Sequence, residues 1–447
     1  MKILIVVHDF LPNYYSGTEV LTFELAKEMD KKNDVLLFFS EPLSEKKDKE
    51  KGIFKGLKYI KINKDITKNI GIEETYNDKR TEKAFFETLD DFKPDIVHLH
   101  HLMHLSINLI DICKKRKIPC IYSLHDFWAI CYNHKKLKYD DSLCKKQEIN
   151  ECLKCFFSTE DSLEKIKRNS KDNRLIGFLI KFNITRFFLK SIIERKVKKD
   201  LKERYRIFRR EFNRLDMIIS PSRFLADEYI KSGIRKNVIH VSDDGINDKY
   251  FKNFKKNKSK KLRFAFIGTL IPAKGCHVLI EAFNNIKEKD IELQIYGTHG
   301  NSKEEKKYYE KLIKDIKNKN IRLCGTFSSD NIADIFKDID ILIVPSIWYE
   351  NGPLVIKNAL LSKTPVIASD LGGMSYLIRH KENGLLFKPN DPKDLYEKLM
   401  IILKNQELIR KLEKNIRKPK SIKENAEELI KIFRRIIKEN NIDKKRN

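Results

Sequence analysis

The sequence predicts an α/β fold made of two doubly wound domains, each with a parallel sheet. Short runs rich in apolar and β-branched residues alternate with segments of helical periodicity. Most of these runs are almost wholly apolar, which is typical of parallel strands covered by helices on both faces. They fall into two sets, and a Lys-rich stretch from Phe251 to Lys261 separates the sets.

The strand candidates follow one another with helical segments between them, which predicts right-handed βαβ units. Ligands bind at the carboxyl ends of such strands, so two facing domains would hold a ligand in the cleft between them. Helical spacing is clear at Leu21–Met29, Val278–Asn285 and Ile332–Phe336. The strand candidates are Ile3–Val7, Val35–Phe39, Ile96–Leu99, Cys120–Leu124, Met217–Ile219 and Val238–Val241, then Leu262–Ile267, Leu293–Tyr296, Ile321–Leu323, Ile341–Val344 and Val366–Ala368.

These patterns also predict where the domains begin and end. The N-terminal domain is expected over residues 1–245, with a Cys-containing loop at 131–155 and a basic helical insertion at 156–214. A linker at 246–261 leads to a second domain at 262–420, and residues 421–447 form a C-terminal helix with a basic tail.

The chain is strongly basic, with a net charge of +27 over 447 residues. Residues 165–214 hold 18 Lys or Arg against 5 Asp or Glu, which is a net charge of +13. A basic helix with apolar residues on one face suits an anionic membrane surface. The alternative is a helical arm that packs its apolar side on the N-terminal domain and leaves a solvated basic face. The charge alone could also suit nucleic acid, but no DNA- or RNA-binding motif supports a specific complex.

No secretory signal or membrane span is expected. The apolar run after Met1-Lys2 is too short for either, and the longest apolar region, Leu175 to Leu189, is interrupted by Lys181 and Arg186. We therefore expect a cytoplasmic protein, with peripheral attachment to the inner face of the membrane as an option. The eight cysteines should then be thiols or metal ligands and not disulfides.

Four of the cysteines lie within 25 residues and end in a Cys-x2-Cys pair. Four thiolates with one close pair suit a tetrahedral structural zinc site, although the long first spacing also fits four reduced, partly buried thiols. The four are Cys131, Cys144, Cys152 and Cys155.

Two loops of the second domain contain the strongest candidates for ligand-binding residues. Gly268-Thr269 ends a strand, and Lys274-Gly275 opens the next helix, so a ligand can approach the backbone and an anion is favoured. Glu350 follows another strand and precedes a helix that is expected to start near Leu354, whose first N–H groups could bind a phosphate or a sugar oxygen.

The N-terminal half has weaker candidates at strand ends. His125 and Gly17 each follow a predicted strand. A histidine hydrogen-bonded at a strand end is the plainer interpretation of His125. For His98, His100, His101 and His104 a metal cluster is conceivable, but cleft-lining or structural histidines fit that spacing better.

Several stretches together resemble one family. They are HDFLPNYYSGTEVLTFELA (8–26), SLHDFWAIC (123–131), SPSRF (220–224), FIGTLIPAKGCHVLIEAF (266–283), PSIWYENGPLV (345–355) and TPVIASDLGG (364–373). The chain looks like a retaining glycosyltransferase of family 4 with the GT-B fold, in which two Rossmann-like domains face each other across a cleft. The resemblance covers nearly the whole chain, and its C-terminal motifs are specific in combination.

The resemblance implies roles for these residues. Lys274 would bind the donor diphosphate, Glu350 the hydroxyls of the donor sugar, and His125 the region near the reacting carbon. Glu350 is the first glutamate of the family's Glu-x7-Glu motif, and Asn358 replaces the second, which accepts bonds from the ribose. The expected donor-binding residues are Gly17, Gly268, Thr269, Lys274, Glu350, Asn351, Gly352, Pro353, Leu354 and Asn358.

The chain departs from the family pattern at three positions. Thr269 stands where the family often has an arginine, Asn358 replaces a glutamate, and Ser16 replaces a glycine. Two cations normally bind the diphosphate, so Lys274 would carry more of the charge.

The resemblance implies sugar transfer from a nucleotide-diphosphate donor to a glycan or lipid-linked acceptor, with retention at the anomeric carbon. Such a reaction would serve the synthesis of cell-surface polysaccharide or glycoconjugate. No cofactor or metal is expected in catalysis, because the nucleotide sugar is a substrate and the donor half has no Asp-x-Asp motif. The alternative is a catalytically weakened GT-B-like protein that still binds a nucleotide sugar, as Thr269 and Asn358 would suggest.

Overall fold

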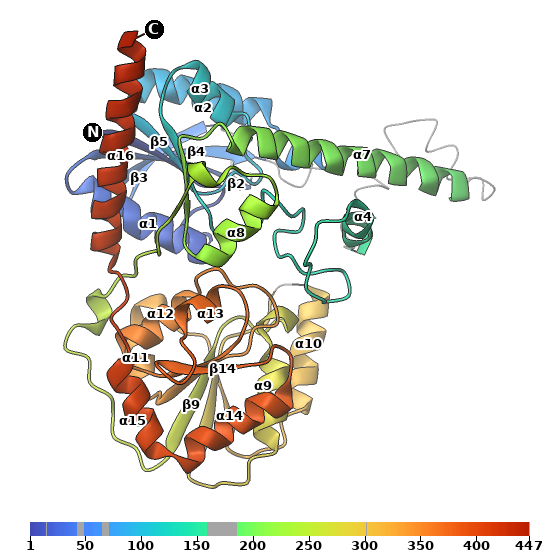
Figure 1. The fold of residues 1–447 in the computed structure, drawn as a ribbon, viewed down its shortest axis with the longest axis vertical. Coiled ribbons are helices and arrows are strands. Elements are labelled where there is room, and N and C mark those ends of the chain that lie inside the picture. The colour runs from blue at the N-terminus through green and yellow to red at the C-terminus, as the bar shows by residue number, and fades with distance from the viewer. Residues whose placement is uncertain (15, 43–48, 65–70, 159–185, 301, 447) are drawn as a thin grey trace. The chain divides into compact units, whose positions relative to one another are not determined.

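The computed structural model describes the chain except for residues 15, 43–48, 65–70, 159–185, 301 and 447 (Figure 1). The chain forms two compact units. The N-terminal unit consists of Met1–Pro221, Leu225–Ser242 and Ala426–Asn447, and the C-terminal unit of Ser222–Phe224 and Asp243–Asn425. Each unit has one mainly parallel sheet with helices between its strands, which confirms the predicted α/β class.

The sheet of the N-terminal unit has eight strands in the order β3-β4-β2-β1-β5-β6-β7-β8. Neighbouring strands run parallel, except for the antiparallel pair of β3 and β4. Every residue of β5 and β6 is buried, as expected for strands covered on both faces. The strands are β1 (Lys2–Val6), β2 (Asp34–Pro42), β3 (Lys49–Phe54), β4 (Leu57–Lys64), β5 (Ile96–Leu99), β6 (Cys120–Ser123), β7 (Met217–Ser220) and β8 (Ile239–Val241).

Helix α7 extends well beyond the sheet of this unit (Figure 1). Leu201 and Phe208 on its inner face are buried, and between them the buried guanidinium of Arg204 donates to the carbonyl oxygen of Trp128. Among the described residues, no helix has both the length and the apolar character needed to cross a membrane. The helices are α1 (Gly17–Asp30), α2 (Lys79–Phe92), α3 (Leu109–Lys115), α4 (Ile149–Ser158), α7 (Arg186–Phe212), α8 (Arg223–Lys231) and α16 (Ile422–Arg446).

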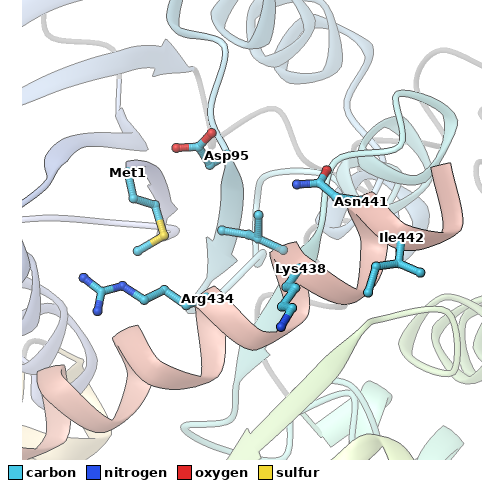
Figure 2. A pocket seen from close by; sticks show the side chains of 7 residues that line it. Met1, Asp95, Arg434, Lys438, Asn441 and Ile442 are labelled. Atoms are coloured by element: carbon cyan, nitrogen blue, oxygen red, sulfur yellow. The ribbon is translucent and has the colours of Figure 1, made fainter. Parts of the chain in front are cut away.

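The C-terminal helix α16 belongs to the N-terminal unit for all but its first turn. Its Phe433 is fully buried and lies edge-on to the ring of His98, with the ring centroids 5.2 Å apart. Farther along, α16 lines a hollow of about 500 Å³ together with Met1 and Asp95 (Figure 2). Both residues precede the strands β1 and β5, so this hollow lies at the end of the sheet opposite to the carboxyl ends, where ligands bind in parallel sheets.

The sheet of the C-terminal unit has six parallel strands in the order β11-β10-β9-β12-β13-β14. The strands are β9 (Leu262–Ile267), β10 (Ile291–Tyr296), β11 (Ile321–Gly325), β12 (Ile341–Val344), β13 (Val366–Ser369) and β14 (Gly384–Phe387). The helices are α9 (Cys276–Asn284), α10 (Lys303–Lys314), α11 (Ile332–Lys337), α12 (Leu354–Leu361), α13 (Gly373–Leu377), α14 (Pro392–Lys404) and α15 (Gln406–Asn415).

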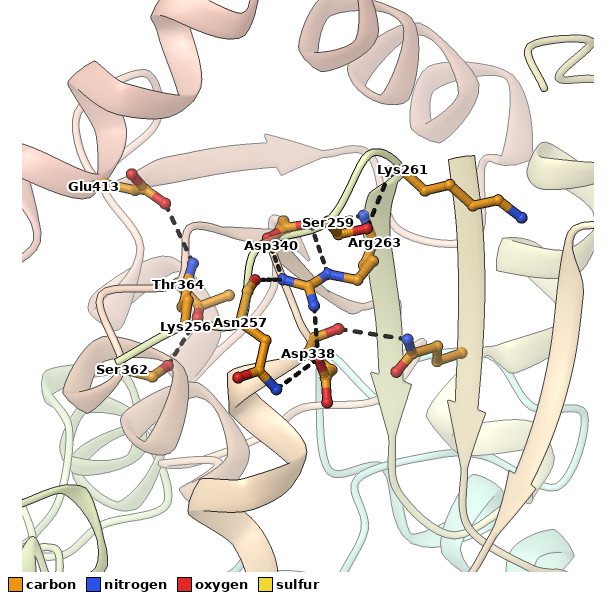
Figure 3. A network of polar contacts seen from close by, with 11 residues as sticks. Lys256, Asn257, Ser259, Lys261, Arg263, Asp338, Asp340, Ser362, Thr364 and Glu413 are labelled. Atoms are coloured by element: carbon orange, nitrogen blue, oxygen red, sulfur yellow. Dashed lines mark hydrogen bonds and ion pairs between the residues drawn. The ribbon is translucent and has the colours of Figure 1, made fainter. Parts of the chain in front are cut away.

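A polar network holds the Lys-rich stretch before β9 onto this unit (Figure 3). The buried guanidinium of Arg263 donates to both carboxylate oxygens of Asp340, at 3.1 and 3.0 Å, and to Asp338 Oδ1 at 2.7 Å. It also donates to the carbonyl oxygen of Asn257 at 2.8 Å. Because these groups lie at the N-terminal ends of β9 and β12, the network stabilises the unit away from the candidate site.

Candidate active site

Three side chains donate hydrogen bonds to one carboxylate oxygen in the C-terminal unit. In the loop after β12, Ser346 Oγ donates to Glu350 Oε1 over 2.9 Å, and Trp348 Nε1 donates to the same oxygen over 2.8 Å. Lys274 Nζ, from the loop after β9, donates to it over 2.6 Å. β9 and β12 are neighbours in the sheet, so the cluster lies at the carboxyl ends of two adjacent strands.

The cluster holds Glu350 as a carboxylate. Its side chain is only 11% exposed, and burial by itself raises the pKa of a carboxyl group. The positive charge of Lys274 and the three hydrogen bonds outweigh this effect, so that the pKa of Glu350 is lowered overall. Lys274 also lies over the ring of Trp348, with Nζ 5.3 Å from the ring centroid, which is a favourable cation–π distance.

Gly275 allows the Lys274 loop to approach the Glu350 loop. Its φ angle of 69° lies in the left-handed region, which favours glycine. A Cβ atom at this position would lie 1.9 Å from the carbonyl oxygen of Pro345, so a larger residue would push the two loops apart. α9 begins at Cys276, so Lys274 stands just before a helix N-terminus, as predicted.

The other predicted donor residues of the β9 loop lie at the same end of the sheet. The N–H of Gly268 donates to the carbonyl oxygen of Tyr296 at 3.0 Å. A Cβ atom at Gly297 would lie 1.9 Å from the carbonyl oxygen of Gly268, so the ends of β9 and β10 are in close contact. Thr269 follows and is exposed.

The segment from Asn351 to Leu354 is partly exposed and leads into α12, with Pro353 as the N-cap. The N–H of Gly373 donates to the carbonyl oxygen of Glu350, and a Cβ atom on Gly373 would lie 2.2 Å from the carbonyl oxygen of Asn351. The loop after β13 therefore fixes the Glu350 loop from a second side. The predicted site residues did not include Gly373, Ser346 or Trp348.

Asn358 lies on α12, partly buried, and the residue before it contributes an ion pair that was not predicted. The side chain of Lys357 is fully buried. Its Nζ lies 2.7 Å from Asp243 Oδ1 and also donates to the carbonyl oxygen of Asp244. This ion pair therefore fixes helix α12 to Asp243 and Asp244 at the start of the C-terminal unit, through the residue next to Asn358.

In the N-terminal unit, histidines gather at the carboxyl ends of β1, β5 and β6. His100 Nδ1 lies 3.0 Å from His125 Nε2, and the two ring planes are within 18° of each other, with centroids 5.2 Å apart. His101 Nδ1 accepts the N–H of Met103, so its proton is on Nε2, which lies 3.3 Å from a carboxylate oxygen of Asp126. This cluster forms no metal site: among the described residues, no three His, Cys, Asp or Glu side chains are grouped to hold an ion.

Burial lowers the pKa values of His98, His100 and His125 and so keeps them neutral, and it also shifts the pKa of a nearby carboxyl group. Burial lowers the pKa of His125 and of His98 to about 3. Burial and the neighbouring Glu19 raise the pKa of Asp9, at the end of β1, to about 7. Gly17 is exposed and is the first residue of α1. Predicted site residues therefore occur in both units, with Gly17 and His125 in the N-terminal one.

Comparison with known protein families shows which family this chain resembles. The family model described as Glycosyl transferases group 1 matches residues 248–419, in the C-terminal unit. The model described as Glycosyltransferase Family 4 matches residues 15–155, in the N-terminal unit. The chain belongs to glycosyltransferase family 4. The resemblance noted in the sequence motifs is confirmed for both units.

The relatives of this family 4 chain include two archaeal proteins. An uncharacterized glycosyltransferase of Methanocaldococcus jannaschii is 30% identical over 222 residues, which is 49% of this chain and 58% of the relative. The chain thus matches less than two thirds of that relative's length. Another uncharacterized glycosyltransferase of the same organism is 22% identical over 403 residues, which is 83% of this chain and 93% of the relative.

Solved structures show the same fold. Sucrose-phosphate synthase from Thermosynechococcus elongatus gives a TM-score of 0.68 at 14% identity, over 97% of this chain and 98% of that structure. HepE from Anabaena, solved in complex with UDP and glucose, gives a TM-score of 0.63 at 15% identity, over 97% of this chain and 99% of that structure. The family 4 chain therefore has the GT-B fold.

The four clustered cysteines of this family 4 member line one hollow. It measures about 540 Å³, and Tyr205 and Lys136 also line it. Burial raises the pKa of each of the four thiols, which favours the protonated form in the metal-free arrangement. Since the described residues include no group arranged to hold a metal, structural zinc stays a prediction from the spacing. The four are Cys131, Cys144, Cys152 and Cys155.

Proposed function

We propose that this chain is a retaining glycosyltransferase that moves a sugar from a nucleotide-diphosphate donor to a glycan or lipid-linked acceptor. The observation that carries the proposal is the convergence of Lys274, Ser346 and Trp348 on Glu350 Oε1. A cation and an ionised carboxylate side by side suit a ligand that has both an anionic and a hydroxyl-rich part. A nucleotide-diphosphate sugar has both.

Each residue of the pair takes one part of the donor. The ammonium of Lys274, just before the N-terminus of α9, stabilises the negative charge that grows on the leaving diphosphate. Glu350 accepts hydrogen bonds from sugar hydroxyls. Its three donors all contact Oε1, so Oε2 is the oxygen through which it would accept them. We assign Gly268, Thr269 and the segment from Asn351 to Leu354, which lie in the loops after β9 and β12, to binding of the same donor.

The acceptor side is assigned to the N-terminal unit. His125 lies at the carboxyl end of β6 and stays neutral at physiological pH because burial lowers its pKa to about 3. A neutral imidazole can form a hydrogen bond with a sugar, and because it has no positive charge it does not compete with Lys274 for the diphosphate. Retention then proceeds on one face of the sugar, with the leaving phosphate taking the acceptor proton, so no nucleophilic carboxylate is required. No cofactor or catalytic metal takes part.

The basic insertion is proposed to hold the enzyme at the inner face of the membrane, beside a lipid-linked acceptor. Residues 159–185 of the insertion lie outside the described residues, so the proposal is argued from α7. Basic side chains recur along α7 with helical spacing and line a hollow of about 380 Å³. Anionic lipid would bind such a row of charges, and added salt would weaken binding. Binding to anionic vesicles but not to neutral ones tests this. The basic residues of the row are Arg195, Lys198, Lys199, Lys202 and Arg206.

A thermal-shift screen against UDP-, GDP- and ADP-sugars tests donor binding, because a ligand that binds the folded state raises its apparent stability. UDP-glucose comes first, because HepE was also solved with UDP-glucose. A transfer assay with glycan and lipid-linked acceptors follows. Stabilisation by a nucleotide sugar with transfer supports the proposal, and no stabilisation by any of them contradicts it.

The second candidate is a catalytically weakened GT-B-like protein that binds a nucleotide sugar. The exposed Thr269, where a second cation is often found, and Asn358 on α12 favour it. Stabilisation by a donor without transfer or hydrolysis would support this candidate.

A further inference from the structure

We propose that His100 is a positioning residue that fixes the tautomer of His125, so that His125 carries its proton on Nδ1 and acts as a hydrogen-bond donor from that atom. The inference deepens the proposed function, because it rests on His125 as a sugar-binding residue. The juxtaposition behind it is the 3.0 Å contact between His100 Nδ1 and His125 Nε2.

Adjacent strands place the two histidines together. β5 and β6 are parallel neighbours, with His98 in register with Ile121. His98 lies in β5 and Ser123 in β6, and His100 and His125 each follow two residues later, just past the ends of these strands. His98 Nε2 lies 2.8 Å from Ser123 Oγ, and both of these residues come two positions before the contacting pair of His100 and His125. The backbone N–H of His100 is itself held by the carbonyl oxygen of Val6, at 2.8 Å.

The direction of the hydrogen bond follows from the far side of the His100 ring. His100 is fully buried, and its Nε2 has no hydrogen-bond partner in the described part of the chain. Burial lowers the pKa of His100 well below its ordinary value, so the ring is neutral and has one proton. If that proton were on Nε2, a buried N–H would lack an acceptor, and orphaned N–H groups are rarer in proteins than under-satisfied acceptors.

The proton of His100 therefore belongs on Nδ1, where it is donated to His125 Nε2. His125 Nε2 must then be the unprotonated nitrogen, and His125 keeps its own proton on Nδ1. The pair of His98 and Ser123 shows the same pattern: among the residues that the structure describes, the buried His98 Nδ1 has no hydrogen-bond partner, and His98 Nε2 faces Ser123 Oγ.

Nitrogen NMR on protein with ¹⁵N-labelled histidine tests the tautomer directly. The signals of His125 are identified as those that disappear in His125→Gln. We expect the wild type to show His125 protonated on Nδ1. His100→Asn keeps an N–H donor near the position of Nδ1 and should preserve this state, whereas His100→Ala should shift His125 toward protonation on Nε2 or toward a mixture. A wild-type His125 protonated on Nε2 would overturn the proposal, whether or not any variant folds.

Kinetics provide the second measurement. His100→Ala should lower kcat by roughly 10–10²-fold, as misplacing one contact at the reacting group does, with little change in donor KM. His100→Asn should recover most of the loss, and the control His240→Ala, a histidine on the edge strand β8, should match the wild type. An unchanged kcat in His100→Ala would also overturn the role. If the wild type transfers no sugar at all, the proposed function fails while the tautomer measurement still decides this inference.

Discussion

Lys274 Nζ lies 2.6 Å from Glu350 Oε1, although 76 positions separate the two residues in the sequence. The cation assigned to the diphosphate and the carboxylate assigned to the sugar are therefore one preassembled pair. A donor that binds here has to share both groups with their present partners, and the positive charge of Lys274 helps to keep Glu350 ionised.

Replacing Glu350 should abolish sugar transfer. Glu350→Ala removes the acceptor for three donors, but Lys274 is 27% exposed and can be solvated, so the unit should still fold. Glu350→Gln keeps the shape and removes the charge, and should also be strongly impaired. Transfer rates are compared with Glu281→Ala, an exposed position on α9. Retained activity in Glu350→Ala would remove this residue from the site.

Replacing Lys274 should reduce turnover more than it reduces stability. Lys274→Ala is expected to lower kcat by roughly 10²–10³-fold, which is typical of losing one preorganised charge-stabilising group. Lys274→Arg keeps the charge and should lose less. The control is Lys287→Ala, an exposed lysine of the same unit. If kcat in Lys274→Ala equals that of the control, another group stabilises the diphosphate.

Asn358→Glu should tighten nucleotide binding. A carboxylate accepts a stronger hydrogen bond from a ribose hydroxyl than an amide does, worth about 1 kcal/mol or roughly a fivefold lower Kd. Titration calorimetry with the free nucleotide measures it. Asn358→Gln, with the same length as glutamate but no charge, is the matched control. Equal Kd values for all three proteins would place Asn358 outside the ribose pocket.

Asp9 should make the stability of the N-terminal unit depend on pH. Its folded pKa of about 7 lies above the unfolded value of about 3.9, because burial and Glu19 disfavour the charged form. The folded state binds this proton more tightly, so the stabilising contribution is complete below about pH 4 and is lost as the pH rises through 7. As the pH rises from about 4 through 7, the Tm of the wild type should therefore fall relative to the Tm of Asp9→Asn. A Tm difference that stays constant with pH would argue against the raised pKa of Asp9.

Lys357→Met should destabilise the C-terminal unit. Removing one partner of a fully buried pair costs about 3–5 kcal/mol, but Asp243 is 25% exposed, so we expect about 1–3 kcal/mol. Denaturant unfolding measures the loss. Adding Asp243→Asn to Lys357→Met should restore part of the stability, whereas Lys393→Met, an exposed lysine on α14, should change little. A loss no larger than that of the control would mean that the pair adds nothing.

The fold could be predicted where strands are covered on both faces, because burial on both sides requires a continuous apolar run. β6 is such a strand, and all its residues are buried. The antiparallel strands β3 and β4 were missed, because KEKGIF and LKYIKINK mix lysines with apolar residues. β3 lies at the edge of the sheet and is only partly buried, so its sequence carries a weaker pattern.

The site could be predicted one residue at a time but not as a set of contacts. Motifs indicated Glu350 and Lys274 separately, and only the adjacency of β9 and β12 brings them together. The buried Lys357 was missed, because a lysine in a helix is normally solvated and its partner Asp243 lies 114 positions earlier. The contact between His100 and His125 depends on the register of β5 and β6, which no local pattern encodes.

Helix α16 has a practical consequence for work with parts of this protein. The N-terminal unit is assembled from both ends of the chain, and the ring of Phe433 covers His98 in its interior. One cut near residue 242 therefore cannot yield two intact halves, since the first fragment would lack the helix that seals its sheet. A deletion meant only to trim the charged C-terminal tail would remove part of α16 and expose the interior of the N-terminal unit to water.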